Sequence, residues 1–371
     1  MTIGRRRSRT SPRTRGPAAP AFIPTHRTPQ AAIRVGTFGI SGLLAAAASR
    51  QLWQRVVSMS TVPPVARLLA ELLDPRAGMS VYDPGFGAGR LLRAMEQHAR
   101  IRSGDNRAAT ALQIFGRELD PIAFSVGAAT LAAARINATI ALGDSLRSAP
   151  HSLLSGTSNG FDRVVLNPTW EQAAPVLPPL ENELLFPYGT PPGDSSDWAW
   201  VQHGLCALAP DGRMAVVLDA GALHRESERA IRAAIVQANL LDAVITCESP
   251  YRGGSPSARI MASFLERAVI LVFDRQNGQN GQGRSTVFID VGELVVDHPL
   301  DFGRLVHEVI HLNRHRVPER GVAGTASPDE IAMRSYDLRP RFFVSHGSRP
   351  HHREQHDQES VRSPDDLANK R

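Results

Sequence analysis

The sequence predicts an α/β fold in which a mostly parallel sheet is covered by helices on both faces. Short apolar strands alternate with amphipathic helices along residues 62–273. A glycine-rich turn follows the first of these strands and opens a helix. Polar residues stand at the ends of the following strands. Such an alternation is typical of parallel sheets, in which ligands bind at the carboxyl ends of the strands.

Apolar periodicity defines the individual elements. Apolar residues that recur every three or four positions predict helices over residues 62–73, 90–99, 122–135, 197–208 and 226–238. Short runs rich in Val, Ile, Leu and Phe predict strands over residues 79–83, 112–117, 138–142, 161–166, 213–218, 240–246 and 268–273. The segment 276–283 (QNGQNGQG) is expected to be a surface loop between two strands.

The two ends of the chain differ from this middle part. Residues 1–34 contain eight arginines and no acidic residue, whereas the formal net charge of the whole chain is only +6. We expect residues 1–30 to be a disordered Arg-rich arm, 31–60 a short helical lead-in, and 346–371 a disordered polar tail. The arm suits contacts with nucleic-acid phosphates. A solvated tail in an arginine-rich protein is the alternative interpretation.

The composition indicates the compartment in which the protein works. No apolar run reaches the eighteen or so residues that a membrane span needs, and no apolar stretch follows the basic N-terminus. Only two cysteines occur, Cys206 and Cys247, which excludes a disulfide framework or a Cys-based zinc site. We therefore expect a cytoplasmic protein that does not bind membranes.

The first candidate site is the segment 83–89 (DPGFGAG), which directly follows the first predicted strand. Glycine has no Cβ, so Gly85, Gly87 and Gly89 allow a tight turn and a close approach of the backbone to a ligand. The N–H groups at the start of the next helix suit a carboxylate or a phosphate. With Asp83 at its head, this segment is a candidate cofactor-binding turn.

Acidic residues end the next two strands. Glu118 and Asp120 follow the second strand, where a carboxylate can accept hydrogen bonds from ribose hydroxyls. Asp144 follows the third strand, where it could reach the amino group of an adenine. Three consecutive strand ends thus predict a nucleotide-cofactor site. An ordinary capped turn and an NAD site remain the alternatives.

The candidate catalytic site follows the fourth strand, as Asn167, Pro168, Thr169 and Trp170. An amino nitrogen conjugated to a purine ring is a poor nucleophile, and acceptors that take up its developing positive charge improve it. An Asn side-chain oxygen can be such an acceptor, and the proline fixes the backbone beside it. An aromatic ring next to it can stack on a base swung out of a duplex. A turn without catalytic function is the alternative.

Taken together, these motifs resemble those of a known enzyme family. Residues from about 61 to 344 resemble the amino-group DNA methyltransferases, and most closely the modification subunit of type I restriction–modification systems. The shared motifs follow the same order in both, namely VPPVARLLAELLDP, VYDPGFGAGRLL, FGRELDP, GDSL, FDRVVLNPTW, SSDWAWVQHGLCALAPDGRMAVVL and YDLRPRFF.

The resemblance implies a Rossmann-like, class I S-adenosylmethionine-dependent methyltransferase fold, with a mostly parallel seven-stranded sheet, over residues 61–345. It implies that S-adenosylmethionine is bound by Asp83, Gly85, Gly87, Gly89, Glu118 and Asp144. Asn167, Pro168 and Trp170 would hold the target adenine, whose N6 amino group is methylated. The implied setting is a restriction–modification or related defence system, with DNA, a specificity subunit and a restriction subunit as candidate partners.

The catalytic motif departs from that family, which has Asn-Pro-Pro followed by Phe or Tyr. Here Thr169 replaces the second proline and Trp170 replaces the usual aromatic residue. These departures leave a second hypothesis, a relative that binds cofactor and DNA without catalysing transfer. Two further tryptophans, Trp198 and Trp200, are expected in the core and in the wall of the pocket.

A third hypothesis rests on a separate motif. The segment HEVIH matches the zinc-hydrolase pattern His-Glu-x-x-His with His307, Glu308 and His311. On a helix the two histidines share one face, which makes metal binding geometrically feasible. In the resembled family this segment is only a linking helix, so no metal is expected.

Overall fold

The computed structural model describes nine stretches of the chain, which are residues 33–35, 61–104, 112–153, 160–170, 173–175, 183–249, 255–279, 284–296 and 302–345. The arm expected over residues 1–30 and the tail expected over 346–371 lie outside the described residues. Most of the lead-in expected over 31–60 does so too. Within that lead-in, residues 33–35 form a strand rather than a helix.

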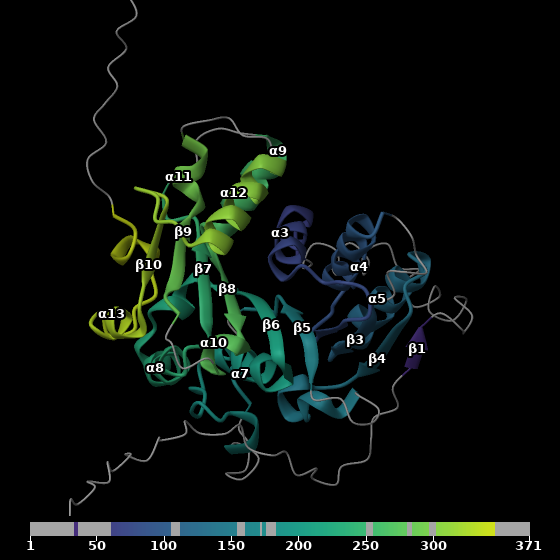
Figure 1. The fold of residues 1–371 in the computed structure, drawn as a ribbon. Coiled ribbons are helices and arrows are strands. Elements are labelled where there is room, and N and C mark those ends of the chain that lie inside the picture. Colours follow the sequence, from purple (N-terminus) through teal and green to yellow (C-terminus); the bar gives the residue numbers. More distant parts are fainter. Residues whose placement is uncertain are drawn as a thin grey trace, which may run out of the picture.

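One sheet organises the described residues (Figure 1). Its ten strands are β1 (Ile33–Val35), β2 (Ser80–Asp83), β3 (Gln113–Glu118), β4 (Ala138–Leu142), β5 (Phe161–Leu166), β6 (Leu208–Asp219), β7 (Leu241–Thr246), β8 (Ala268–Asp274), β9 (Thr286–Asp290) and β10 (Ala323–Ala326). Their order across the sheet is β1-β4-β3-β2-β5-β6-β8-β7-β9-β10.

Strands β4, β3, β2, β5 and β6 are mutually parallel, and β7 and β9 run in the same direction. Strand β8 lies antiparallel between β6 and β7. Strands β1 and β10 pair antiparallel at the two edges. The seven strands expected from the sequence are all present. The expected total of seven is too low, because β1, β9 and β10 extend the sheet at its edges.

The helices are α3 (Pro63–Leu73), α4 (Arg90–Arg102), α5 (Pro121–Ala133), α7 (Asp197–Ala207), α8 (Arg229–Gln237), α9 (Pro256–Leu265), α10 (Arg275–Gln279), α11 (Val291–Val296), α12 (Phe302–His315) and α13 (Pro328–Ala332). Short 3-10 helices are η2 (Ser145–Arg147), η3 (Pro150–Leu153), η4 (Ala220–Leu223), η5 (Glu226–Glu228) and η6 (Pro340–Phe342). Within the described ranges, no helix combines the length and apolar character that crossing a bilayer requires.

Two hydrophobic cores lie on opposite faces of the sheet. Because side chains alternate along a strand, Val81 of β2 enters one core and Tyr82 enters the other. The first core packs against α3, α4, α5, α9 and α12, and the second packs against α7, α8 and α13. Both faces of the sheet are therefore buried, which leaves the carboxyl ends of the strands as the place for a ligand.

Candidate cofactor and substrate pocket

A cavity of about 1010 Å³ opens at the carboxyl ends of β2, β3, β4 and β5. Seven of the nine site residues expected from the sequence line it, namely Asp83, Gly85, Gly87, Glu118, Asp144, Asn167 and Pro168. Gly89 and Trp170 do not line it. The structure thus brings the expected cofactor residues and the Asn-Pro motif around one cavity.

The glycine-rich turn is shaped by backbone conformation and by packing. Gly87 and Gly89 have φ angles of +49° and +77°, a region that favours glycine. Gly89 caps α4, and a Cβ there would lie 3.2 Å from the carbonyl oxygen of Gly127 in α5. Gly89 therefore serves the contact between the turn and α5, which explains why it does not line the cavity.

Asp83 places a buried carboxyl group at this turn. Its exposed fraction is 1%. Its Oδ1 accepts a hydrogen bond from the Gly85 N–H at 3.0 Å, whereas no described residue hydrogen-bonds to its buried Oδ2. Burial, with a smaller contribution from the negative charge of Glu118, raises the pKa of Asp83 to about 8. An unused oxygen in a cavity wall is suited to a cationic or N–H group of a ligand.

Glu118 links the turn to the end of β3. Its Oε2 accepts from the Gly87 N–H at 2.8 Å and its Oε1 from the Asp120 N–H at 2.9 Å. Burial raises the pKa of Glu118. Each carboxylate oxygen can accept more than one hydrogen bond, so Glu118 retains capacity for ribose hydroxyls. Asp120 caps α5 by accepting from the Ile122 and Ala123 N–H groups.

Asp144 stands on the cavity wall at the start of η2. Its Oδ1 accepts from the Leu146 N–H at 2.9 Å, and its Oδ2 lies 3.5 Å from the Nε of Arg147. The exposed apolar side chains of Leu119 and Ile122 line the same cavity. An acid beside exposed apolar side chains suits a flat heteroaromatic ring with an amino group.

Asn167 and Pro168 follow β5 on the cavity wall. The Asn167 Nδ2 donates a hydrogen bond to the Oγ1 of Thr61 at 2.9 Å. Thr61, which precedes α3, also lines the cavity and is 6% exposed. Thr61 was not predictable from the sequence, because a threonine ahead of a helix resembles any helix-initiating residue.

The three tryptophans in and around the site occupy different places. The centroids of the Trp170 ring and the Phe264 ring of α9 lie 5.5 Å apart. The buried Nε1 of Trp170 has no hydrogen-bond partner among the described residues. By contrast, Trp200 of α7 lines the cavity. Trp198 is fully buried and donates to the Ala222 carbonyl at 3.0 Å. The expectation of core and pocket-wall positions for Trp198 and Trp200 is confirmed.

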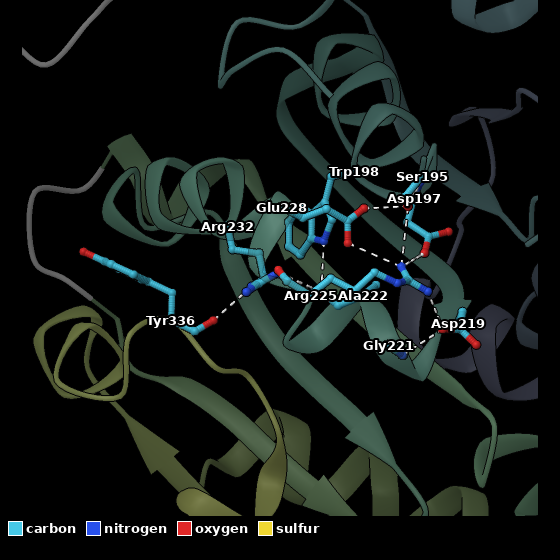
Figure 2. Close-up of polar contacts among 10 residues, drawn as sticks. All are labelled: Ser195, Asp197, Trp198, Asp219, Gly221, Ala222, Arg225, Glu228, Arg232 and Tyr336. Carbon is cyan, nitrogen blue, oxygen red and sulfur yellow. Dashed lines mark hydrogen bonds and ion pairs between the residues drawn. The ribbon is translucent and has the colours of Figure 1, made fainter. Parts of the chain in front are cut away.

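A charged cluster beyond Trp198 joins α7 to the end of β6 (Figure 2). Arg225 contacts Asp197 at 2.5 Å, Asp219 at 2.5 Å and Glu228 at 3.3 Å. Ser195 donates to Glu228 at 2.6 Å. Burial raises the pKa of Asp197 and of Glu228. This cluster was not predictable from the sequence, because its members come from two stretches, residues 195–197 and 219–228, that only the fold brings together.

The His-Glu-x-x-His motif lies on α12. His307 and His311 are exposed, and their ring centroids are 6.4 Å apart. Within the part of the chain that the structure describes, no group of three or more His, Cys, Asp or Glu side chains could hold a metal ion. The zinc-hydrolase hypothesis therefore has no support in the arrangement of these residues.

Comparison with known proteins agrees with this architecture. Residues 58–351 match the family described as N-6 DNA Methylase. A type I restriction enzyme methylase subunit (MjaVIII) of Methanocaldococcus jannaschii is 28% identical over 299 residues, which are 76% of this chain and 48% of that protein. The HindI methylase subunit of Haemophilus influenzae is 26% identical over 189 residues, which are 50% and 41% of the two chains.

Solved structures show the same fold. The methyltransferase subunit of a type I restriction–modification system from Streptococcus thermophilus aligns with a TM-score of 0.64 at 22% identity, over 77% of this chain and 59% of that one. The chain spans about half the length of the curated relatives it matches. The fold is the Rossmann-like class I methyltransferase fold, and the resemblance to type I modification subunits is confirmed. On the match across residues 58–351, the chain belongs to the N-6 DNA methylase family.

Proposed function

We propose that the chain transfers a methyl group from S-adenosylmethionine to the N6 amino group of adenine in DNA. One observation supports this most strongly, which is that Asp83, Glu118 and Asp144 line the same cavity as Asn167 and Pro168. A methyltransferase needs its cofactor and its target atom side by side. The cavity is lined both by residues suited to the cofactor and by residues suited to the target base.

The cavity residues fit this cofactor. The buried, unpartnered Oδ2 of Asp83 suits a cationic amino group, and Glu118 has acceptor capacity for ribose hydroxyls. Asp144, in a cavity that Leu119 and Ile122 also line, suits an adenine ring. When bound, the cofactor would supply an electrophilic methyl group.

In the proposed reaction Asn167 is the catalytic acceptor. Its side-chain oxygen would accept a hydrogen bond from the target amino group and stabilise the positive charge that develops as the nitrogen is methylated. Pro168 restricts the backbone at this position.

Trp170 is proposed to stack on the target base after the base leaves the duplex. In the structure the indole packs against Phe264 and lies off the cavity wall. Stacking on a base held in the cavity therefore requires the indole to move toward the cavity. This placement also favours the second hypothesis, a relative that binds cofactor and DNA without transfer.

DNA, a specificity subunit and a restriction subunit are the proposed partners. The relatives are named as subunits of restriction enzymes, and this chain matches about half of each relative's length.

The test is methyl transfer from labelled S-adenosylmethionine to separate pools of DNA, RNA and protein, with and without added specificity subunit. Label in the N6 position of DNA adenine is the expected result. Label only in RNA or protein would overturn the proposed substrate. Calorimetric binding of cofactor and DNA without any label transfer would favour the non-catalytic relative. Asp83→Ala should abolish cofactor binding and is the negative control.

A further inference from the structure

We propose that Thr61 is a positioning residue, which holds the side-chain amide of Asn167 so that the amide oxygen is available to the target amino group. This inference rests on the proposed function, in which that oxygen is the acceptor. It assigns a role to a residue that lies 106 positions before Asn167 along the chain.

The contact itself is short and sheltered. The Asn167 Nδ2 donates to the Thr61 Oγ1 at 2.9 Å, a normal hydrogen-bond length. Thr61 is 6% exposed, so bulk water does not readily replace its hydroxyl as the partner. Both side chains line the cavity, which places this bond beside the position where a target base would enter.

The orientation of the Asn167 amide matters to the chemistry. An Asn side chain has an NH₂ group that only donates and an oxygen that only accepts, and the two have nearly the same shape. With the NH₂ group held by Thr61, the oxygen accepts no hydrogen bond from any described residue and remains available. The reverse orientation would present N–H groups to the N–H groups of the target, which cannot pair.

Thr61 is itself held in place. Its carbonyl oxygen accepts from the Arg90 Nη1 at 3.5 Å. The next residues begin α3 with two prolines, Pro63 and Pro64, which restrict the backbone. Helix α3 is anchored in the first core through buried side chains such as Leu68. The hydroxyl therefore stands on a rigid element, as a group that orients another must.

The test compares Thr61→Val, which keeps the shape but removes the hydroxyl, with Thr61→Ser, which keeps the hydroxyl. Thr246→Val is the matched control, because Thr246 is also buried but its Oγ1 has no hydrogen-bond partner among the described residues. Single-turnover transfer to DNA is measured at saturating cofactor, and cofactor affinity is measured by calorimetry. Urea midpoints are measured for Thr61→Val, Asn167→Ala and the double variant.

We expect Thr61→Val to slow transfer roughly three- to tenfold, as for the loss of one hydrogen bond, with unchanged cofactor affinity. Thr61→Ser should restore most of the rate, and Thr246→Val should match the wild type. Thr61→Val should also lower the urea midpoint of the wild type more than that of Asn167→Ala, because the hydrogen bond is already absent there.

Three outcomes would overturn the inference. The first is a Thr61→Val variant as fast as an active wild type. The second is a cofactor affinity that calorimetry finds weakened in Thr61→Val, which would make Thr61 a cofactor-binding residue. The third is strict additivity of the two urea midpoint shifts, which would show that the hydrogen bond does not form. A wild type that transfers no methyl group would instead contradict the proposed function, and with it the positioning role of Thr61.

Discussion

In the proposed reaction, the side-chain oxygen of Asn167 accepts a hydrogen bond from the target amino group. We expect Asn167→Ala to abolish transfer, because loss of a transition-state acceptor costs about 3 kcal/mol or more. Cofactor binding should persist, since the proposed cofactor residues are other members of the cavity wall. Single-turnover transfer and calorimetry measure the two effects. Transfer that survives Asn167→Ala would falsify the proposed site.

The buried carboxyl of Asp83 makes stability depend on pH. Its folded-state pKa of about 8 lies above the ordinary value of 3.8. The folded protein therefore retains this proton where the unfolded chain has lost it. The stabilisation is fully present below about pH 4 and is lost as pH rises through 8, by up to about 1.4 kcal/mol per pH unit.

Asp83→Asn does not titrate and should remove this dependence. Its free energy of unfolding, measured in urea without cofactor, should exceed that of the wild type by a margin that grows from pH 5 to pH 8. A constant margin across that range would mean that Asp83 is already ionised in the folded protein. Asp120→Asn is a suitable control, because Asp120 caps α5 near the same cavity but is exposed.

The residues of the site differed in how predictable they were. Asp83, Glu118, Asp144 and Asn167 follow strands at positions where a parallel sheet gathers its strand ends, so their convergence could be expected. Thr61 could not be expected, because its partner is distant in sequence and its own surroundings are those of an ordinary helix start. The placement of the Trp170 ring depends on α9, which the sequence pattern did not predict.

At the scale of elements, the Arg225 cluster joins α7, β6 and η5 through charges, in addition to the apolar contacts between α7 and β6 in the second core (Figure 2). We expect Arg225→Met to lower the free energy of unfolding by about 3 kcal/mol, because it leaves the buried carboxylates of Asp197 and Glu228 without their cation. Urea denaturation measures the change.

Arg229→Met is the matched control for this prediction. Arg229 pairs with Glu226 at 3.0 Å, but both side chains are exposed, so its loss should cost less than about 1 kcal/mol. Equal midpoints for the two variants would show that the Arg225 cluster adds little to stability.

Elements with strong periodicity were predicted closely. The strands expected over residues 138–142 and 161–166 coincide with β4 and β5. Strand β6 begins earlier than expected, at Leu208, which pairs with Phe161 of β5. The pairing then shifts register across the polar segment PDG and resumes at Arg213, where β8 also begins to pair. The edge strands β1 and β10 were missed, since runs of three and four residues carry almost no periodic signal.

At the scale of the whole molecule, the Arg-rich arm lies outside the described residues and its role stays a prediction. If its arginines bind phosphates, removal of residues 1–30 should weaken DNA binding. It should also reduce the salt dependence by about one unit of log–log slope for each phosphate that the arm neutralises in the full chain. Cofactor affinity should hardly change. Binding titrations across salt concentrations measure the slope.

Removal of residues 346–371, a tail of mixed charge, is the control for this experiment. The tail variant should keep the salt slope of the full chain. An arm variant with an unchanged slope would show that the arm is only a solvated segment.

The edge of the sheet at β9 and β10 affects the tendency of the protein to aggregate at high concentration. A long apolar edge strand offers unpaired backbone groups to other chains and promotes aggregation. Strand β9 is buried at all five positions and would form such an edge by itself. The short antiparallel β10 covers it and leaves only four residues of edge backbone. Strand β10 thus occupies backbone groups of β9 that could otherwise pair with another molecule. Loss of β10 would favour aggregation even with the pocket intact.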